Sequence, residues 1–272
     1  MKIAMTGASG FVANALRKVF PDVVSIERGD GVEDILKKLD GVYAVFNLAG
    51  APIAKRWDEE YKKVLYKSRI ETTKKVVQAI NKSNVEHFIS TSAVGVYPND
   101  VACDEATSRL NDDFLAHIVK DWEREALACN KKTTILRFGV VFGKDGGALS
   151  AMLPAFKFGF GGTIGDGSMV VSWIDINDLC KIYQFVLQNK LSGIFNATSP
   201  KPVTNLVLTK TLGKLLNRPT LFPLPKFLVK LIFSQGASVL LDSKEVYPKA
   251  LLENGFKFEY PNIEMSLRNI LF

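Results

Sequence analysis

The chain has 272 residues, of which 47% are hydrophobic and 23% charged, and its formal net charge is +7. These proportions are those of a soluble globular protein, long enough to bury a core in one or two domains. Lysines are scattered in pairs without a long basic run, so we expect no nucleic-acid partner. Three cysteines without C-x-x-C spacing and two distant histidines predict neither a disulfide frame nor a metal site.

Two kinds of apolar pattern alternate through the first half of the chain. Short apolar runs predict strands, and longer runs with apolar positions three or four residues apart predict helices. The strands are predicted over residues 3–5, 23–26, 42–48, 87–92 and 133–142, and the helices over residues 11–20, 32–39, 61–81 and 111–130. This order predicts an α/β fold, a Rossmann-type doubly wound parallel sheet with helices on both faces.

Further along the chain the composition becomes glycine-rich, over residues 158–167. A strand is predicted next over 170–176, then a helix over 179–188 with Asp178 as its N-cap, and a strand over 193–198.

The remaining residues contain prolines and helical segments. We therefore expect an NAD(P)-binding domain over 1–198, with 143–170 contributing to the substrate lobe, and a smaller C-terminal substrate-side domain over 199–272. The uncharged stretch 231–241 is shorter than the roughly 20 apolar residues that span a bilayer. No signal-peptide cleavage site stands out, so we expect a cytoplasmic protein without a membrane partner.

The stretch T-G-A-S-G-F-V-A at residues 6–13 joins the first predicted strand to the first predicted helix. Glycines such as Gly7 and Gly10 let the backbone approach a pyrophosphate, and the helix N-terminus offers free N–H groups. The small Ala13 suits close helix–strand packing. The alternative is an ordinary glycine turn, but the position at the start of the chain before strand 23–26 favours a dinucleotide site.

Ligands of doubly wound sheets bind beyond the carboxyl ends of the strands. The strand ends that form the candidate site are 7–11, 27–28, 48–50, 90–93 and 137–141.

Several spaced motifs occur together in one order along the whole chain. They are Thr6-Gly7-x-x-Gly10, Asn47-Leu48-Ala49-Gly50-Ala51-Pro52, Arg56-Trp57, Ser68-Arg69 with Thr72, Ser92-Ala93-Val94-Gly95, Trp122-Glu123, Arg137-x-Gly-Val-Val, Gly146-Gly147-Ala148-Leu149, Ser172-Trp173-Ile174 with Asp178, and Tyr260-Pro261. With these motifs the chain resembles the atypical extended short-chain dehydrogenase/reductases, in the YfcH-like "epimerase family protein" group of the NAD-dependent epimerase/dehydratase superfamily. The resemblance includes a small C-terminal domain of unassigned function from about residue 221.

The resemblance implies a Rossmann domain with bound NADP(H) and a substrate pocket roofed by the C-terminal part, but it implies no particular substrate. It also implies site residues, matched position by position. Those facing the pyrophosphate and ribose are Gly7, Ser9, Gly10, Phe11 and Val12. Those along the adenine and ribose are Leu48, Ala49 and Gly50. Arg69 points toward the cofactor, and Ser92 and Val141 lie near the nicotinamide. A solvent-facing helix arginine is the alternative role for Arg69.

Cofactor choice depends on two adjacent residues, Glu27 and Arg28. An acid at the end of the second strand binds ribose hydroxyls and selects NAD(H), whereas an arginine pairs with the 2′-phosphate of NADP(H). The family has the arginine, and Glu27 before it is a departure. We favour NADP(H), with NAD(H) as the alternative.

The acid/base pair of the wider superfamily is a tyrosine followed four residues later by a lysine, and no Tyr-x-x-x-Lys occurs in this chain. If Glu123 marks the acid that follows this motif, its two positions hold Leu115 and Val119. The remaining catalytic candidates are Ser92, as an orienting hydroxyl, and Tyr97. Equally open are a strand-end serine bonded to backbone and a tyrosine packed in a surface turn.

Two classes of function stay open. The first is an NADP(H)-dependent oxidoreductase acting on an unidentified small carbonyl or hydroxyl compound. The second is a non-catalytic NADP(H)-binding sensor or partner protein, and a nucleotide-sugar epimerase or dehydratase is a further alternative. A working epimerase is not expected, because it must move a proton reversibly and the tyrosine–lysine pair is absent. We expect a monomer or a homodimer.

Overall fold

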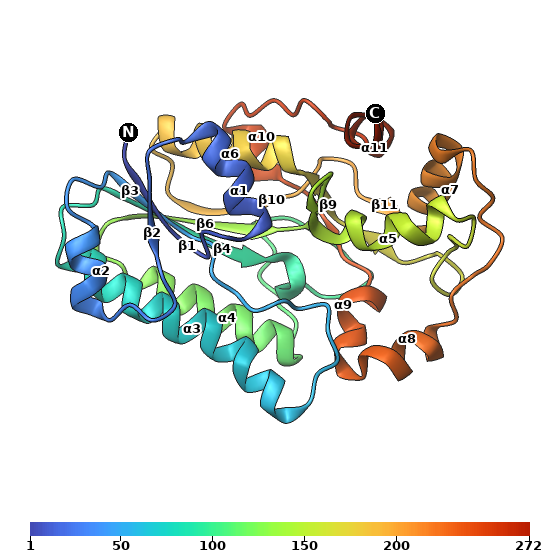
Figure 1. Cartoon of the computed structure of the whole chain (residues 1–272), viewed down its shortest axis with the longest axis horizontal. Coiled ribbons are helices and arrows are strands. Elements are labelled where there is room, and N and C mark those ends of the chain that lie inside the picture. Colours follow the sequence, from blue (N-terminus) through green and yellow to red (C-terminus); the bar gives the residue numbers. More distant parts are fainter.

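The computed structural model describes all residues, Met1–Phe272, and is built on one six-stranded sheet (Figure 1). Its order is β10-β6-β4-β3-β1-β2, and every neighbouring pair is parallel. The strands are β1 Ile3–Thr6, β2 Val23–Ile26, β3 Ala44–Asn47, β4 His87–Ala93, β6 Lys132–Phe138 and β10 Gly193–Ala197. Strand order reverses between β1 and β3, and sheets of this type bind their ligands at the carboxyl ends of the strands beside such a reversal. The predicted doubly wound α/β fold is confirmed.

Helices cover both faces of the sheet (Figure 1). Helices α1 (Phe11–Val19) and α6 (Ile176–Gln188) pack on one face, where Met5 and Phe46 belong to the same apolar cluster. The opposite face is covered by α2 (Val32–Lys38), α3 (Glu59–Asn81) and α4 (Phe114–Leu127). Strand side chains alternate between the two layers, so Ala4 and Val45 join the second cluster. These strands have no polar face, and this is why they read as continuous apolar runs.

The single strand predicted over 133–142 is wrong, because the chain breaks at Gly139. A Cβ on Gly139 would lie 2.6 Å from the Ser172 carbonyl oxygen, so only glycine allows this crossing. After the break, β7 (Val140–Gly143) leaves the main sheet and pairs with β9 (Trp173–Asp175).

The predicted cap of helix α6 is also wrong. The N-cap is Asp175, whose side chain accepts the Asn177 N–H at 2.8 Å. Asp178 lies one turn further on, buried, and its two carboxylate oxygens accept the N–H groups of Glu259 and Tyr260. Asp178 therefore fastens the C-terminal segment to α6.

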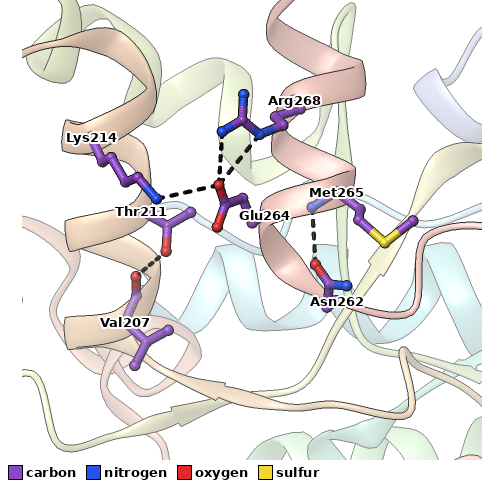
Figure 2. A network of polar contacts seen from close by, with 7 residues as sticks. All are labelled: Val207, Thr211, Lys214, Asn262, Glu264, Met265 and Arg268. Atoms are coloured by element: carbon purple, nitrogen blue, oxygen red, sulfur yellow. Dashed lines mark hydrogen bonds and ion pairs between the residues drawn. The ribbon is translucent and has the colours of Figure 1, made fainter.

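Leu251 and Phe256 of the C-terminal part join the apolar cluster of the main sheet, whereas its other portion packs on β7 and β9. Its apolar cluster joins Phe142 and Trp173 to α5 (Gly147–Lys157), α7 (Asn205–Leu216) and α11 (Ile263–Leu271). Figure 2 shows α7 and α11 side by side, with Lys214 and Glu264 between them. The remaining elements are short: β5 Ala102–Cys103, β8 Val170–Val171, β11 Val203–Thr204, α8 Lys226–Phe233, α9 Ser238–Leu241, β12 Glu245–Val246, α10 Lys249–Glu253, and the 3₁₀ turns Val94–Val96 and Gln235–Ala237.

None of the helices is both long enough and apolar enough to cross a membrane. Strand β12 pairs in parallel with β5, so the C-terminal chain returns to the Rossmann part after α8 and α9.

His87 is the first residue of β4 and is buried beside β6. Its Nε2 lies 2.8 Å from the Thr134 hydroxyl, and its Nδ1 has no partner. Burial, together with the nearby charge of Lys132, lowers the pKa of His87 to about 4. The folded protein therefore keeps this imidazole neutral at pH values where an unfolded chain protonates it.

We predict that the parent protein loses stability relative to His87→Phe as pH falls from about 6.5 to about 4. In this window the unfolded state binds the extra proton, and the full shift is worth about 3 kcal/mol. The raised pKa of Asp175, about 6, acts in the opposite direction, but it is present in both proteins and cancels in their difference. Chemical denaturation at several pH values measures this difference; identical pH profiles would contradict the assignment.

Candidate functional site

The loop between β1 and α1 comes into close contact with the end of β3. Gly7 has a φ of +60°, and a Cβ there would lie 3.0 Å from the Leu48 carbonyl oxygen and 3.1 Å from the Ala49 nitrogen. Gly10 caps α1 without any side-chain hydrogen bond to the first turn. The N–H groups that begin α1 are therefore left without a side-chain acceptor, which suits an anion such as pyrophosphate.

Thr6 holds the two loops together. Its hydroxyl oxygen accepts the N–H groups of Leu48 at 2.9 Å and Ala49 at 3.0 Å, and its proton is donated to Asn47 Oδ1 at 2.8 Å. The Asn47 amide in turn donates to the hydroxyls of Thr73 and Ser90, which brings β4 into the same buried network. The carboxyl ends of β1, β3 and β4 are thus fixed relative to one another.

The aromatic ring of Phe11 fills the space between α1 and the turn before α5. A Cβ on any of the three glycines of this turn would lie 2.5–3.1 Å from that ring. The glycines are Gly143, Gly146 and Gly147. Val141 is half-buried on β7 beside the turn, Val12 is half-buried on α1, and Ser9 is exposed at the loop tip. The structure therefore brings Ser9, Phe11, Val12 and Val141 to one edge of the sheet.

Arg69 reaches from α3 to the end of β3. Its Nη2 donates to the Ala51 carbonyl at 3.0 Å, and a Cβ on Gly50 would lie 3.1 Å from its Cζ. The guanidinium lies over the Trp122 ring at 5.5 Å, and burial lowers its pKa to about 10. Arg69 thus braces the loop after β3 at the candidate site.

Glu27 and Arg28 are both exposed at the end of β2, and neither side chain has a hydrogen-bond or ion-pair partner. A second guanidinium lies close to them, that of Arg17 from the last turns of α1. Its Nη2 donates to the Ser25 hydroxyl at 2.8 Å, and its Nε points to the Ala8 carbonyl at 3.4 Å. Arg17 was missed by the sequence analysis, although its place on α1, two turns after the glycine loop, was the available signal.

A buried polar network lies at the carboxyl ends of β4 and β6. The Ser92 hydroxyl donates to Glu123 Oε1 at 2.5 Å, and the Arg137 guanidinium donates two hydrogen bonds of 2.7 Å to the same carboxylate. Arg137 Nη1 also donates to the Tyr97 hydroxyl at 2.8 Å, and that hydroxyl donates to Asn196 Oδ1 at 2.9 Å. The network includes both catalytic candidates.

The ionisation of this network follows from its contacts. Burial on its own would disfavour the Arg137 guanidinium charge, but the Glu123 carboxylate holds the pKa of Arg137 above its ordinary value. Burial raises the pKa of Tyr97, which is fully inaccessible to solvent. The arrangement keeps a charged pair in the interior, with each oxygen of the carboxylate occupied.

The face of α4 that carries Glu123 is otherwise apolar. Leu115 and Val119 precede it by two turns and one turn, and both are buried. Glu123 is therefore the only ionisable group that this face offers. The pairing of Glu123 with Arg137 was also missed by the sequence analysis, which treated one as a motif marker and the other as a strand end.

Comparison with known proteins places these observations in a family. Residues 3–197 match the "NAD dependent epimerase/dehydratase family", and residues 224–270 match a "Domain of unknown function (DUF1731)". The chain is 35% identical over 305 residues to "Epimerase family protein SDR39U1 homolog, chloroplastic" of Arabidopsis thaliana, covering 100% of this chain and 87% of that one.

Two further relatives extend the comparison. The Staphylococcus aureus (strain MRSA252) "Epimerase family protein SAR0825" is 35% identical over 235 residues, with 84% of this chain and 78% of that one covered. The crystal structure of human epimerase family protein SDR39U1 (isoform2) with NADPH is 30% identical, has a TM-score of 0.93 and covers 99% of each chain.

We predict that Gly7→Ala destabilises the protein by about 1–3 kcal/mol, because alanine disfavours the left-handed conformation and its Cβ would press on the end of β3. Gly95→Ala is the matched control: Gly95 has no atom near its would-be Cβ and no positive φ. Urea unfolding measures both changes, and equal effects of the two substitutions would refute the tight approach at Gly7.

Proposed function

The chain belongs to the NAD dependent epimerase/dehydratase family, and from that premise we propose that it binds NADP(H) and oxidises or reduces a small hydroxyl or carbonyl compound. The family resemblance drawn from the sequence is thereby confirmed. The observation that carries the cofactor proposal is the Gly7–Gly10 loop, whose backbone lies against the end of β3 and leaves the start of α1 open to an anion. The human relative was crystallised with NADPH, which supports the choice of cofactor.

The charges around the end of β2 support NADP(H) over NAD(H). Arg17 is held between Ser25 and the Ala8 carbonyl, and Arg28 is exposed nearby. The positive charge of two guanidinium groups exceeds the negative charge of the Glu27 carboxylate, and this favours a cofactor with a phosphate on the adenosine ribose. Arg17 is already positioned by its hydrogen bonds, so binding a phosphate would cost it little side-chain entropy.

Ser92 and Glu123 supply the proton path that we propose in place of the tyrosine–lysine pair. The Ser92 proton is already donated to Glu123, so the Ser92 oxygen remains free to accept a hydrogen bond from a substrate hydroxyl. When bound, the nicotinamide cofactor accepts or supplies the hydride. As the carbon–hydrogen bond of the alcohol breaks, the hydroxyl proton passes to Ser92 Oγ and the original Ser92 proton passes to Glu123. Carbonyl reduction is the reverse.

Arg137 positions this path without touching the substrate in our proposal. Its two hydrogen bonds orient the Glu123 carboxylate, one of whose oxygens also accepts the Ser92 hydroxyl proton. Tyr97 acts in the same way, since its hydroxyl bridges Arg137 and Asn196 inside the protein.

A second function, NADP(H) binding without turnover, is favoured by one observation. The two positions of α4 that would carry the usual acid/base pair hold Leu115 and Val119, and Tyr97 is wholly buried. A protein of this kind would use cofactor binding itself as its signal.

The expected cytoplasmic location stays a prediction, since the Arabidopsis relative is described as chloroplastic. The expected monomer or homodimer and the assignment of the C-terminal substrate-side domain also stay predictions.

We predict that NADPH binds more tightly than NADH, and that Arg17→Ala and Arg28→Ala each reduce this preference by about tenfold or more, as expected for a charge-assisted contact to phosphate. Isothermal titration calorimetry measures the affinity of the parent and of each variant for NADPH and for NADH. Arg109→Ala, an exposed arginine without a polar partner, is the matched control. A preference for NADH that Glu27→Ala reverses would make Glu27 the selector instead.

We predict that Ser92→Ala lowers the turnover of any accepted alcohol or carbonyl by roughly 10²–10⁴-fold, because it removes the first group of the proton path, while NADPH affinity is unchanged. A panel of short-chain, cyclic and aromatic alcohols and carbonyls, followed by NADPH absorbance, provides the assay. Unchanged turnover in Ser92→Ala would refute the path. Intact NADPH binding with no turnover on the whole panel would support the second function.

A further inference from the structure

The positive charge of the chain is concentrated in one segment. Residues 179–241 contain no Asp or Glu, although they make up almost a quarter of the chain. The segment carries eight basic residues, so the rest of the chain is close to neutral. They are Lys181, Lys190, Lys201, Lys210, Lys214, Arg218, Lys226 and Lys230.

Large apolar side chains protrude into solvent from this segment and from the loop beside it. We call six of them the apolar rim: Phe158, Phe160, Phe222, Phe227, Leu231 and Ile232. Their exposed fractions run from 56% to 78%, far above what packing in a core leaves accessible. Exposed apolar residues gathered in this way mark an interaction surface rather than ordinary solvent-exposed scatter.

The apolar rim is formed by two segments of backbone that lie side by side. The rings of Phe160 and Phe222 lie 6.4 Å apart. Leu224 then hydrogen-bonds through its backbone to Thr163 and Gly165, which keeps the two segments side by side up to the start of α8. In Figure 1 the connection from α7 runs along the outer edge of the molecule and ends in α8 at its corner.

Helix α8 presents apolar and basic stripes next to each other. Phe227 and Leu231 are four residues apart and lie on one exposed stripe, while Lys226 and Lys230 form the adjacent one. Val229 is fully buried and fastens the helix to the protein from the other side. Aromatic and aliphatic groups beside lysines are the pattern of a helix that lies in a membrane interface, with the lysines reaching the headgroups.

Basic groups also surround the outer end of α7. A depression of about 500 Å³ is lined by Lys210, Lys214 and Arg218. Figure 2 shows that Glu264 is shared between Lys214 and Arg268, at 3.5 and 2.9 Å. One carboxylate therefore offsets two cations, and the end of α7 keeps a positive excess next to the apolar rim.

We propose that the apolar rim docks the protein on an anionic lipid surface, with Lys226 and Lys230 facing the phosphate layer. The charge favours this occupant: Lys230 has no acidic partner and Lys226 only the exposed Asp166 at 3.8 Å, so a second copy seated on this surface would bring like charges together. The shape agrees: the rim side chains protrude instead of lining a groove, as insertion between headgroups requires. The contact is superficial, since no helix crosses the membrane. It departs from the expectation of no membrane partner and does not depend on the proposed function.

Sedimentation of the full chain with lipid vesicles tests the proposal. We expect binding to phosphatidylcholine vesicles that contain one third phosphatidylglycerol, weak binding to phosphatidylcholine alone, and loss of binding at high salt. Lys226→Ala with Lys230→Ala should weaken binding roughly thirtyfold. Phe227→Ser with Leu231→Ser should weaken it at least tenfold, as buried apolar area is lost.

Matched double variants control for general changes of charge and surface. They are Lys74→Ala with Lys75→Ala, and Leu127→Ser with Leu252→Ser, all exposed outside the apolar rim. Both controls should bind as the parent does, and the unfolding midpoint of each variant should be unchanged. No binding to anionic vesicles, or equal losses in the controls, overturns the proposal. So does a dimer, seen by analytical ultracentrifugation without lipid, that Phe227→Ser with Leu231→Ser abolishes.

Discussion

The geometry of the proposed cofactor site, at the carboxyl ends of β1 and β3, depends on the hydroxyl of Thr6. It accepts two backbone N–H groups from the start of the loop after β3 and donates to Asn47, so one small side chain closes the gap between β1 and β3. Buried backbone donors need partners, and without this oxygen both would be left unsatisfied. Gly7 can come within van der Waals contact of Leu48 only because Thr6 has already drawn the loops together. The crevice where strand order reverses is therefore shaped by hydrogen bonds at its floor.

A second buried network fixes β4, β6 and β10 relative to one another, as the Thr6 hydrogen bonds fix β1 and β3. The Glu123–Arg137 pair joins α4 to β6, and the Tyr97 hydroxyl extends the network to Asn196 on β10. Lys244 then donates to the Tyr97 carbonyl, and Asn196 to the Tyr247 carbonyl, which ties in the C-terminal chain. A charged pair in the interior is retained only when its hydrogen bonds are complete, and here they are. The network gives one polar anchor to both parts of the protein.

The main sheet and the glycine loop could be predicted from the sequence because their signals are local. Strands buried on both faces read as apolar runs, and the turn from strand to helix requires glycines at fixed positions. The errors arose where a distant residue decides. The strand pattern is uniform through Gly139, and the break there depends on the distant Ser172 carbonyl. Asp175 and Asp178 both fit a helix cap by sequence, but Asp178 instead accepts the N–H groups of Glu259 and Tyr260. Arg17 and the Glu123–Arg137 pairing likewise depend on tertiary contacts.

The loop after β3 runs from the proposed cofactor site to α8. Arg69 braces its beginning through the Ala51 carbonyl, and further along Arg56 donates to the Leu231 carbonyl. The Trp57 indole donates to the Ile53 carbonyl, and its backbone N–H donates to the Phe233 carbonyl. Residues 51–57 therefore contact both Arg69, beside the end of β3, and the carboxyl end of α8.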